Sequence, residues 1–203
     1  MRASHGDAII HLVKYLNVTR TQLITLDTDV NKSFEVYADK HFFSNWYRRT
    51  AGDDPSTSKY CTGYSVLYAC WHIIWCSKLQ TQIALYTTEA EYIDLYQSLR
   101  DSIPMIQLLR EIKENGFYTL STTPQVHCKS FKDNSGALEL ARNPKMRPCT
   151  KHTNQVYHHF RYFVLNGTIQ NFGIDSQNQI ANIFTKPLPQ NIFLRHRKKI
   201  LWW

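Results

Sequence analysis

The chain has 203 residues, a formal charge of +8 at pH 7 and a sequence pI near 9.3. This length suffices for one sizeable core, and a content of 43% hydrophobic and 13% aromatic residues excludes a disordered composition. The positive charge favours an anionic partner, most often nucleic acid, although simple solubility would explain it too.

The cysteines indicate a reducing compartment. Their number is odd, no Cys-x-x-Cys pair occurs, and a disulfide framework is therefore not expected. They are Cys61, Cys70, Cys76, Cys128 and Cys149. The first sixteen residues contain Asp7 and His11 and do not form a secretory signal, and no later apolar run is long enough to span a membrane. We therefore expect a soluble intracellular protein.

The N-terminal thirty residues are predicted to be separate from the rest. Residues 5–17 place Ala8, Ile9, Leu12, Val13 and Leu16 at helical spacing, which predicts an amphipathic helix. A polar stretch follows, so we place a boundary near Asn31. Residues 1–30 then look like the end of another unit, residues 31–190 form the main domain, and residues 191–203 form a flexible basic tail.

The main domain begins with three predicted strands. Residues 34–39 alternate and are rich in β-formers, and residues 61–70 and 71–77 lie so close together that they predict a hairpin. The period then becomes helical, with Pro104 predicted to kink or restart the long helix. The remaining predicted elements are the long helix at 87–112, a strand at 126–133, helices at 134–143 and 151–167, a strand at 168–174 and a helix at 178–186.

This order predicts an α/β fold. A leading antiparallel run followed by βα units implies a mixed five-stranded sheet, in the order βββαβαβα, with helices packed on it.

Three carboxylates stand at informative places in these elements. Asp39 ends the first predicted strand, Glu91 lies near the start of the long helix, and Asp133 ends the fourth strand. If the first and fourth strands are neighbours, Asp39 and Asp133 converge, and Glu91 reaches them from the helix. Such a cluster of hard oxygen ligands suits Mg²⁺ or Mn²⁺, and two such ions support phosphodiester cleavage.

Each acid also has a purely structural interpretation. Thr88 to Glu91 fits the Ser/Thr-x-x-Glu capping box, so that Glu91 would only close a helix N-terminus. Asp133 would belong to the turn that leads into a helix, and Asp39 would be solvated at a strand end. For any single acid, periodicity alone favours the structural interpretation. For the three acids taken together, a metal site and the structural interpretations have equal weight.

Four motifs then identify a resemblance. "TTEAEYI", "DNSGALELARNPKMRP", "TKH" and "NQIANIFTKPLPQ" resemble, in this order, the ribonuclease H region of the Pol polyprotein of copia-type LTR retrotransposons. The resemblance covers about residues 34–189, and residues 5–20 resemble the connection from reverse transcriptase. It implies a ribonuclease H-like fold, a two-metal site for Mg²⁺ or Mn²⁺ and hydrolysis of the RNA strand of RNA–DNA hybrids.

The resemblance also assigns residues. It implies that Asp39, Glu91 and Asp133 are catalytic metal ligands and that Asn182 stands at the fourth position, where the family has Asp. An amide oxygen can coordinate a hard cation but brings no charge, so the site is expected to be weakened. Lys40 and His41 replace a small residue and an acid, and Cys149 replaces an Arg, as in a decaying genomic copy.

The expected partners follow from the same motifs. The residues expected to contact nucleic acid are Asn134, Ser135, Arg142, Lys145, Lys151 and His152. The reverse transcriptase domain of the same polyprotein is a second expected partner, whereas no membrane and no small-molecule cofactor are expected. The protein would act in the cytoplasm, within a virus-like particle, or in the nucleus. Two other interpretations remain open: an inactive remnant that binds nucleic acid, and a structural segment of a longer polyprotein.

Overall fold

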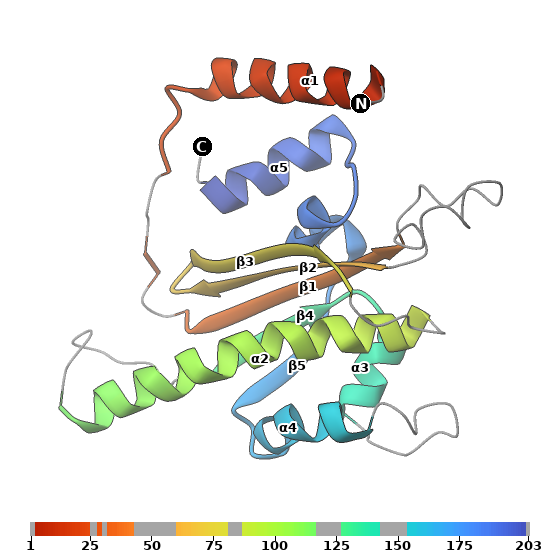
Figure 1. The fold of residues 1–203 in the computed structure, drawn as a ribbon. Coiled ribbons are helices and arrows are strands. Elements are labelled where there is room, and N and C mark those ends of the chain that lie inside the picture. The colour runs from red at the N-terminus through yellow and green to blue at the C-terminus, as the bar shows by residue number, and fades with distance from the viewer. Residues whose placement is uncertain are drawn as a thin grey trace.

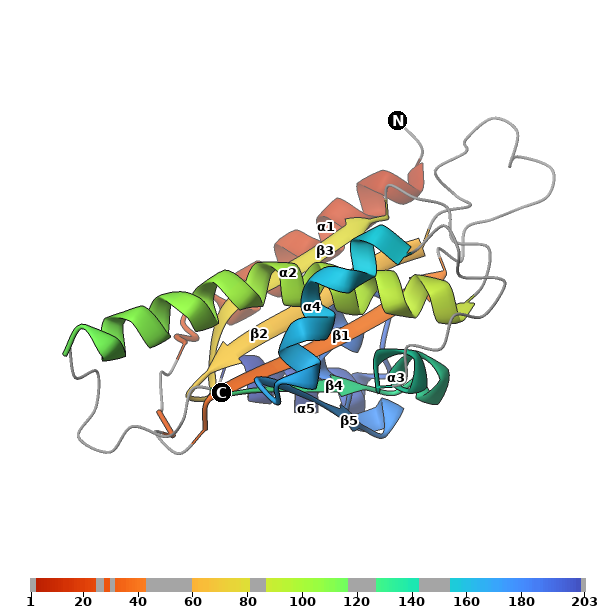
Figure 2. The same cartoon turned by 90° about the horizontal axis from the view of Figure 1, so that it is seen from below.

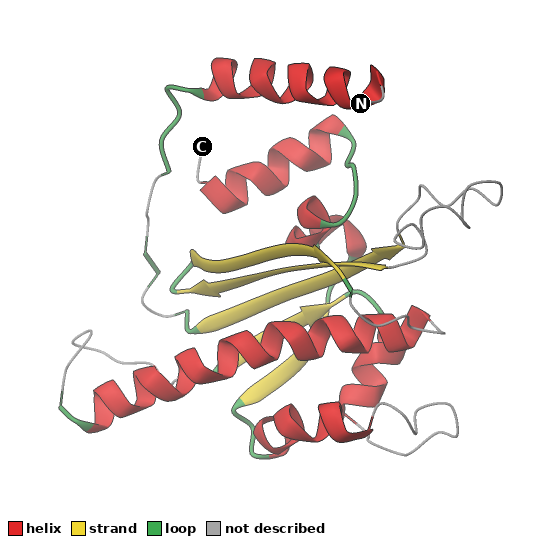
Figure 3. Cartoon of the chain, viewed as in Figure 1, coloured by secondary structure: helices red, strands yellow, loops and turns green. Residues whose placement is uncertain are grey.

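The computed structural model describes residues 3–24, 28–29, 32–42, 60–80, 87–116, 127–142 and 154–201. Figure 1 shows the arrangement of the elements, and Figure 3 separates helices, strands and loops. In chain order the elements are α1 (Ala3–Thr19), β1 (Phe34–Phe42), β2 (Tyr60–Tyr68), β3 (Trp71–Leu79), α2 (Thr87–Glu114), β4 (Cys128–Lys132), α3 (Ser135–Arg142), α4 (Asn154–Leu165), β5 (Ile169–Gly173), the 3₁₀ helices η3 (Ser176–Asn178) and η4 (Ile180–Phe184), and α5 (Gln190–Leu201). Among the described helices, none is both long and apolar enough to cross a membrane.

The five strands form one mixed sheet in the order β3-β2-β1-β4-β5. The first three strands pair antiparallel, whereas β4 runs parallel to both of its neighbours, β1 and β5. The predicted α/β fold class, a mixed five-stranded sheet with packed helices, is confirmed. In particular, β1 and β4 are adjacent, which is the condition on which convergence of Asp39 and Asp133 depends.

The core lies between the sheet and α2. Along β1 every second residue, Phe34, Val36 and Ala38, is buried, as a strand with one face toward a helix requires. The helix contributes a buried stripe at helical spacing, formed by Leu95, Leu99, Ile103 and Ile106. Of the two effects predicted for Pro104, a kink or a restart of the helix, the restart is wrong, because α2 continues through Pro104 to Glu114. Pro104 itself is exposed.

The sheet separates two layers of helices. The helices α2, α3 and α4 cover one face, whereas η3, η4 and α5 lie on the other, with α1 beyond α5 (Figures 1 and 2). Tyr15 of α1 meets Phe193 of α5 with ring centroids 6.3 Å apart. The predicted apolar stripe of α1 stays more than half exposed at Ile9, Leu12, Val13 and Leu16.

The C-terminal part differs from its prediction in two ways. Residues 178–186 do not form one helix: η3 ends at Asn178 and η4 spans only Ile180–Phe184, and the side chains of Asp175 and Gln179 cap these two 3₁₀ turns separately. Gln179 is fully buried and donates hydrogen bonds to the backbone carbonyls of Ala38 and Phe131, which fixes η4 against β1 and β4. The basic end expected to be flexible forms α5, with His196 fully buried.

Candidate metal centre and nucleic-acid interface

Three carboxylates meet at one end of the sheet. One oxygen each from Asp39, Glu91 and Asp133 can be chosen so that all three lie within 4.8 Å of one another. The parallel register pairs Tyr37 with Phe131, and its continuation by two residues puts Asp39 beside Asp133. Glu91 reaches them from α2, which packs across β1. The geometry thus brings together the three acids that the sequence singled out.

Asp39 lies inside its strand rather than at its end. The strand β1 continues three residues further than predicted, to Phe42, and Asp39 is 2% exposed rather than solvated. Its Oδ2 atom accepts a hydrogen bond of 2.5 Å from Thr185 Oγ1 and lies 3.5 Å from Lys186 Nζ. Residues that directly follow η4 therefore orient this carboxylate and partly neutralise it.

Glu91 has a buried ammonium group as its partner. Lys132, the last residue of β4, is fully buried and donates hydrogen bonds to Glu91 Oε2 and, at 2.8 Å, to Asp94 Oδ2. The Glu91 carboxylate therefore forms a buried ion pair with Lys132. The capping-box interpretation, in which Glu91 only closes the N-terminus of the helix, does not account for this ion pair. The sequence analysis missed Lys132 and Asp94.

Two signals in the sequence would have found this pair. Alternate residues of a strand share one face, so Lys132 lies on the same face of β4 as Cys128 and Ser130, which point into the core. A buried lysine is therefore expected at this position. Asp94 is three residues after Glu91 and therefore shares its face of α2. A lysine and an acid that both face the same core imply a buried ion pair.

Burial and pairing act in opposite directions on these groups. Burial raises the pKa of Glu91 and raises that of Asp94 still more, whereas the Lys132 ammonium group opposes both shifts. Burial lowers the pKa of Lys132, but Asp94 and Glu91 together outweigh it and leave the pKa above its ordinary value. Lys132 therefore stays charged near neutral pH.

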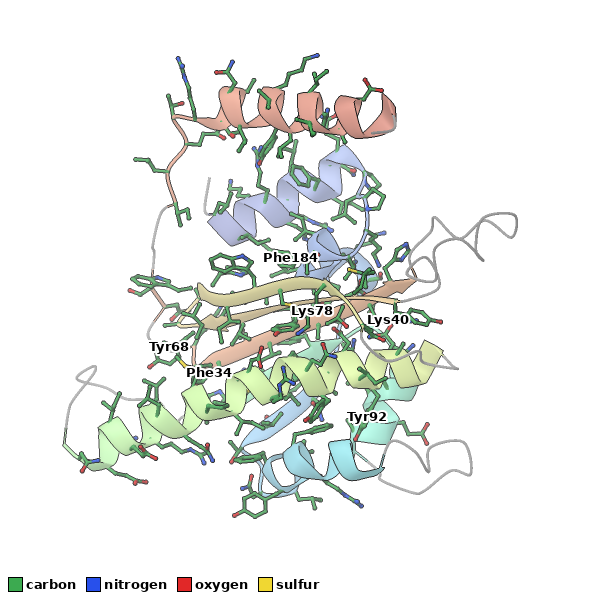
Figure 4. All side chains as sticks on the ribbon, viewed as in Figure 1. Phe34, Lys40, Tyr68, Lys78, Tyr92 and Phe184 are labelled. Atoms are coloured by element: carbon green, nitrogen blue, oxygen red, sulfur yellow. The ribbon has the colours of Figure 1, made fainter. Side chains whose placement is uncertain are left out.

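The two residues after Asp39 add positive charge. Lys40 lies near the N-terminal half of α2 (Figure 4), with its ammonium 4.4 Å from the centroid of the Tyr60 ring. Burial lowers its pKa, and the nearby Glu91 carboxylate acts in the opposite direction. Burial and the adjacent Lys186 lower the pKa of His41 as well.

Asn182 lies in η4 and is 3% exposed. Its Nδ2 group donates a 2.7 Å hydrogen bond to the backbone carbonyl of Ser176, whereas its Oδ1 atom accepts no hydrogen bond from the residues that the structure describes. A buried amide oxygen without a donor is costly unless water or a cation satisfies it. This orphaned oxygen is the feature of Asn182 that suits a metal ligand.

Comparison with known proteins identifies relatives of this chain. It is 30% identical, over 97% of its length, to a retrovirus-related Pol polyprotein from transposon RE2 of Arabidopsis thaliana, and 29% identical, over 97%, to the one from transposon RE1. It is 33% identical, over 69% of its length, to the one from transposon TNT 1-94 of Nicotiana tabacum. The chain is a relative of transposon Pol polyproteins.

The chain corresponds to a small part of each relative. It spans 12% of the RE1 and RE2 polyproteins and 10% of the TNT 1-94 polyprotein. No family model matches it. Among solved structures it is similar to the N-terminal RNase H domain of rv2228c from Mycobacterium tuberculosis, with 11% identity, a TM-score of 0.47 and coverage of 82% of this chain and 96% of that one. The fold assignment rests on this chain's own strand order.

The donor atoms of the carboxylate cluster fit a divalent cation. The three clustered carboxylate oxygens are the hard ligands that Mg²⁺ and Mn²⁺ take. The Oδ1 atom of Asn182, in η4, is a further buried oxygen of the same chemical kind. The surrounding charges are less suitable for a bound cation, because Lys132 already pairs with Glu91 and Lys186 already pairs with Asp39.

The structure describes only part of the predicted nucleic-acid interface. Asn134 caps α3, because its Oδ1 atom accepts a 3.0 Å hydrogen bond from the Ala137 backbone N–H. Ser135 is exposed at the first position of this helix, and Arg142 is its last residue, with a side chain outside the described part. Lys145, Lys151 and His152 lie outside the described residues.

A second basic region lies on the other face of the sheet. A cavity of about 450 Å³ is lined by residues of α5 and of the strands, and its lining includes the cationic side chains of Lys32, Arg195, Lys198 and Lys199 beside the single carboxylate of Glu35. The carboxylate cluster does not line this cavity. The net positive charge of this cavity lining is part of the +8 of the whole chain and would attract an anion.

Proposed function

We propose that this chain is the ribonuclease H domain of a copia-type retrotransposon Pol polyprotein, and that its site hydrolyses the RNA strand of RNA–DNA hybrids. The observation that carries the proposal is the convergence of Asp39, Glu91 and Asp133 within 4.8 Å on a ribonuclease H-like fold. The three acids come from elements far apart in the sequence. Their structural interpretations, taken one at a time, do not explain why they meet.

Mg²⁺ or Mn²⁺ is the proposed cofactor. Asp39, Glu91 and Asp133 would hold it, with the Asn182 amide oxygen as a weak, uncharged fourth ligand. When bound, such ions stabilise developing negative charge on phosphodiester oxygens and lower the pKa of water. Asn182 supplies no charge, so the proposed activity is impaired.

The residues after η4 hold the first acid in place. The hydroxyl of Thr185 and the ammonium of Lys186 both bind Oδ2 of Asp39. Both contacts use one carboxylate oxygen of Asp39, so the second oxygen would remain for a cation. A carboxylate fixed in this way needs little reorganisation when a charged substrate arrives.

Nucleic acid would be attracted by the positive charge of the chain. We propose that the hybrid contacts the helix start at Asn134 and Ser135, followed by Arg142, Lys145, Lys151 and His152. Such contacts go mainly to phosphates, so they give affinity that falls with salt rather than sequence specificity. The activity would take place in the cytoplasm, within a virus-like particle, or in the nucleus.

A second candidate is a remnant that binds hybrids without cutting them. Three observations favour it: the Lys132 ammonium on Glu91, the Lys186 ammonium on Asp39, and an amide in place of an acid at Asn182. Each lowers the negative charge that a pair of divalent cations requires. The same fold and basic surface would still bind the hybrid.

The exposed stripe of α1 supports a proposed contact with the reverse transcriptase domain. Ile9, Leu12, Val13 and Leu16 present apolar side chains that the described part of the chain does not cover. Co-expression with that domain tests the contact: Leu12→Glu with Leu16→Glu should abolish co-purification. Unchanged co-purification of this double variant would contradict the contact.

Cleavage of a labelled RNA–DNA hybrid tests the proposed function. Wild type and Asn182→Asp are compared in Mg²⁺ and in Mn²⁺, with Asp39→Asn as the inactive control and duplex DNA as the control substrate. We expect slow, metal-dependent cleavage of the RNA strand by wild type and faster cleavage by Asn182→Asp. Hybrid binding without cleavage by either would support the remnant instead.

A further inference from the structure

The Lys132 ammonium occupies a place in the acid cluster that a metal ion would otherwise share. Lys132 is fully buried and binds Glu91, one of the three clustered acids. Its second partner, Asp94, is also fully buried, accepts at 2.8 Å and belongs to no metal-binding group among the described residues. Asp94 therefore has one evident role, which is to hold the ammonium.

The backbone makes this arrangement rigid. Lys132 ends the inward face of β4, and Glu91 and Asp94 lie one helical turn apart on the face of α2 that covers it. A buried ammonium with one carboxylate partner is neutral as a pair, and a second carboxylate adds a further strong, charge-assisted hydrogen bond. Lys132 thus cannot move into solvent without leaving Asp94 buried and unpaired.

The formal charge of the region supports the same conclusion. Four carboxylates, those of Asp39, Glu91, Asp94 and Asp133, are accompanied by the three ammonium groups of Lys40, Lys132 and Lys186. The formal net charge is then −1, so the built-in ammonium groups offset most of the carboxylate charge that divalent cations would otherwise offset. Like-charged carboxylates that would repel one another are separated by built-in cations.

We propose that Lys132 is a tethered cation that competes with divalent metal for Glu91, and that Asp94 is the anchor that keeps it there. This inference rests on the proposed metal site and deepens it. It explains how the three acids stay together in a chain that lacks the fourth. It also predicts two separate causes of weak metal binding, the amide of Asn182 and the ammonium group of Lys132. Substituting each residue separately distinguishes the two causes.

The test replaces the anchor and the tethered cation together. The double variant Asp94→Ala with Lys132→Met removes one carboxylate and one ammonium, so the net charge of the cluster is unchanged while Glu91 is released. A matched control, Glu111→Ala with Lys113→Met, removes one of each from the exposed end of α2. If the first variant binds metal more tightly than the control, the cause is therefore the place of the removed groups beside Glu91 and not a change in net charge.

Mn²⁺ binding is measured without nucleic acid, by calorimetry and by the electron paramagnetic resonance signal of free Mn²⁺. We expect the dissociation constant of the double variant to be at least about tenfold below those of wild type and the control, a difference of about 1.4 kcal/mol. The melting temperature of the double variant should rise at an Mn²⁺ concentration at least about tenfold lower than that needed for the same rise in wild type. Circular dichroism confirms that each variant is folded.

Equal Mn²⁺ affinity of the double variant and wild type would overturn the inference, and so would the absence of binding to both. Hybrid cleavage separates these results from the proposed function. If wild type cuts the hybrid and the affinities are equal, the metal site stands and the role of Lys132 fails. If no variant binds Mn²⁺ or cuts, the metal site itself fails. A variant that unfolds is replaced by Asp94→Asn with Lys132→Met, for which the same tenfold gain is expected.

Discussion

Gly63 of β2 allows η4 to approach the sheet, and alanine at this position should disturb both the fold and the site. Gly63 pairs with Asp39, and a Cβ atom built on it would lie 2.4 Å from Thr185 Cγ2 and 2.9 Å from Phe184 Cβ. Both distances are shorter than real Cβ contacts, so η4 must move. Overpacking of this kind costs about 2 kcal/mol, which lowers the melting temperature of a chain of this size by roughly 4–8 °C.

Thermal unfolding followed by circular dichroism measures this effect, and Gly173→Ala is the control. A Cβ atom at Gly173 would meet only Leu138 Cδ1, at 3.6 Å, which is an ordinary contact, so the melting temperature should change by less than about 2 °C. Since Thr185 binds Asp39, Gly63→Ala should also weaken Mn²⁺ binding. Equal melting temperatures for the two variants would refute the described packing of η4 on β2.

Three further predictions concern single side chains. Lys132→Met alone leaves Asp94 buried without its partner and should lower the free energy of unfolding by about 3–5 kcal/mol in urea, whereas a loss below 1 kcal/mol would contradict the buried pair. Asn134→Ala removes the cap of α3 and should cost about 1 kcal/mol in the same assay, against no loss for Ser135→Ala. Burial, with repulsion from Arg195 and Lys199, lowers the pKa of His196 to about 4, below its ordinary value of 6.5, so the unfolded chain binds more protons between these pH values. Stability should therefore fall by about 1–3 kcal/mol as the pH drops from 6.5 to 4, and His196→Gln should reduce this fall, whereas an unchanged pH profile would show that His196 is not buried as described.

The sequence predicted the sheet because its strands have a clear two-residue period. Alternation in residues 34–39 predicted the strand, and the structure shows that Phe34, Val36 and Ala38 form its buried face. The neighbours of β1 were not predicted, because adjacency of the first and fourth strands was only a condition, which the observed strand order meets. Convergence of Asp39 and Asp133 followed from one condition, that β1 and β4 are adjacent. These features depend on local patterns and on general rules of chain connection.

The features that were missed depend on contacts between distant segments. Residues 178–186 have helical spacing, but Gln179 binds the carbonyls of Ala38 and Phe131, and this tertiary contact selects two short turns instead. Prediction of the ion pair of Lys132 with Asp94 would have required two patterns to be combined, namely which residues of β4 and which residues of α2 face the core. The tail after residue 190 was predicted from its charge alone, although Ile192, Phe193 and His196 have helical spacing.

The central claim is that the three carboxylates form a metal-dependent site for cutting RNA in a hybrid, weakened by Asn182 and Lys132. The most direct test is cleavage of a hybrid with a labelled RNA strand by a chain that carries Asn182→Asp, Asp94→Ala and Lys132→Met, with and without Asp39→Asn. We predict Mg²⁺-dependent cleavage of the RNA strand, faster than that of wild type and abolished by Asp39→Asn. A folded triple variant that binds both Mn²⁺ and hybrid but leaves the RNA intact would contradict the account.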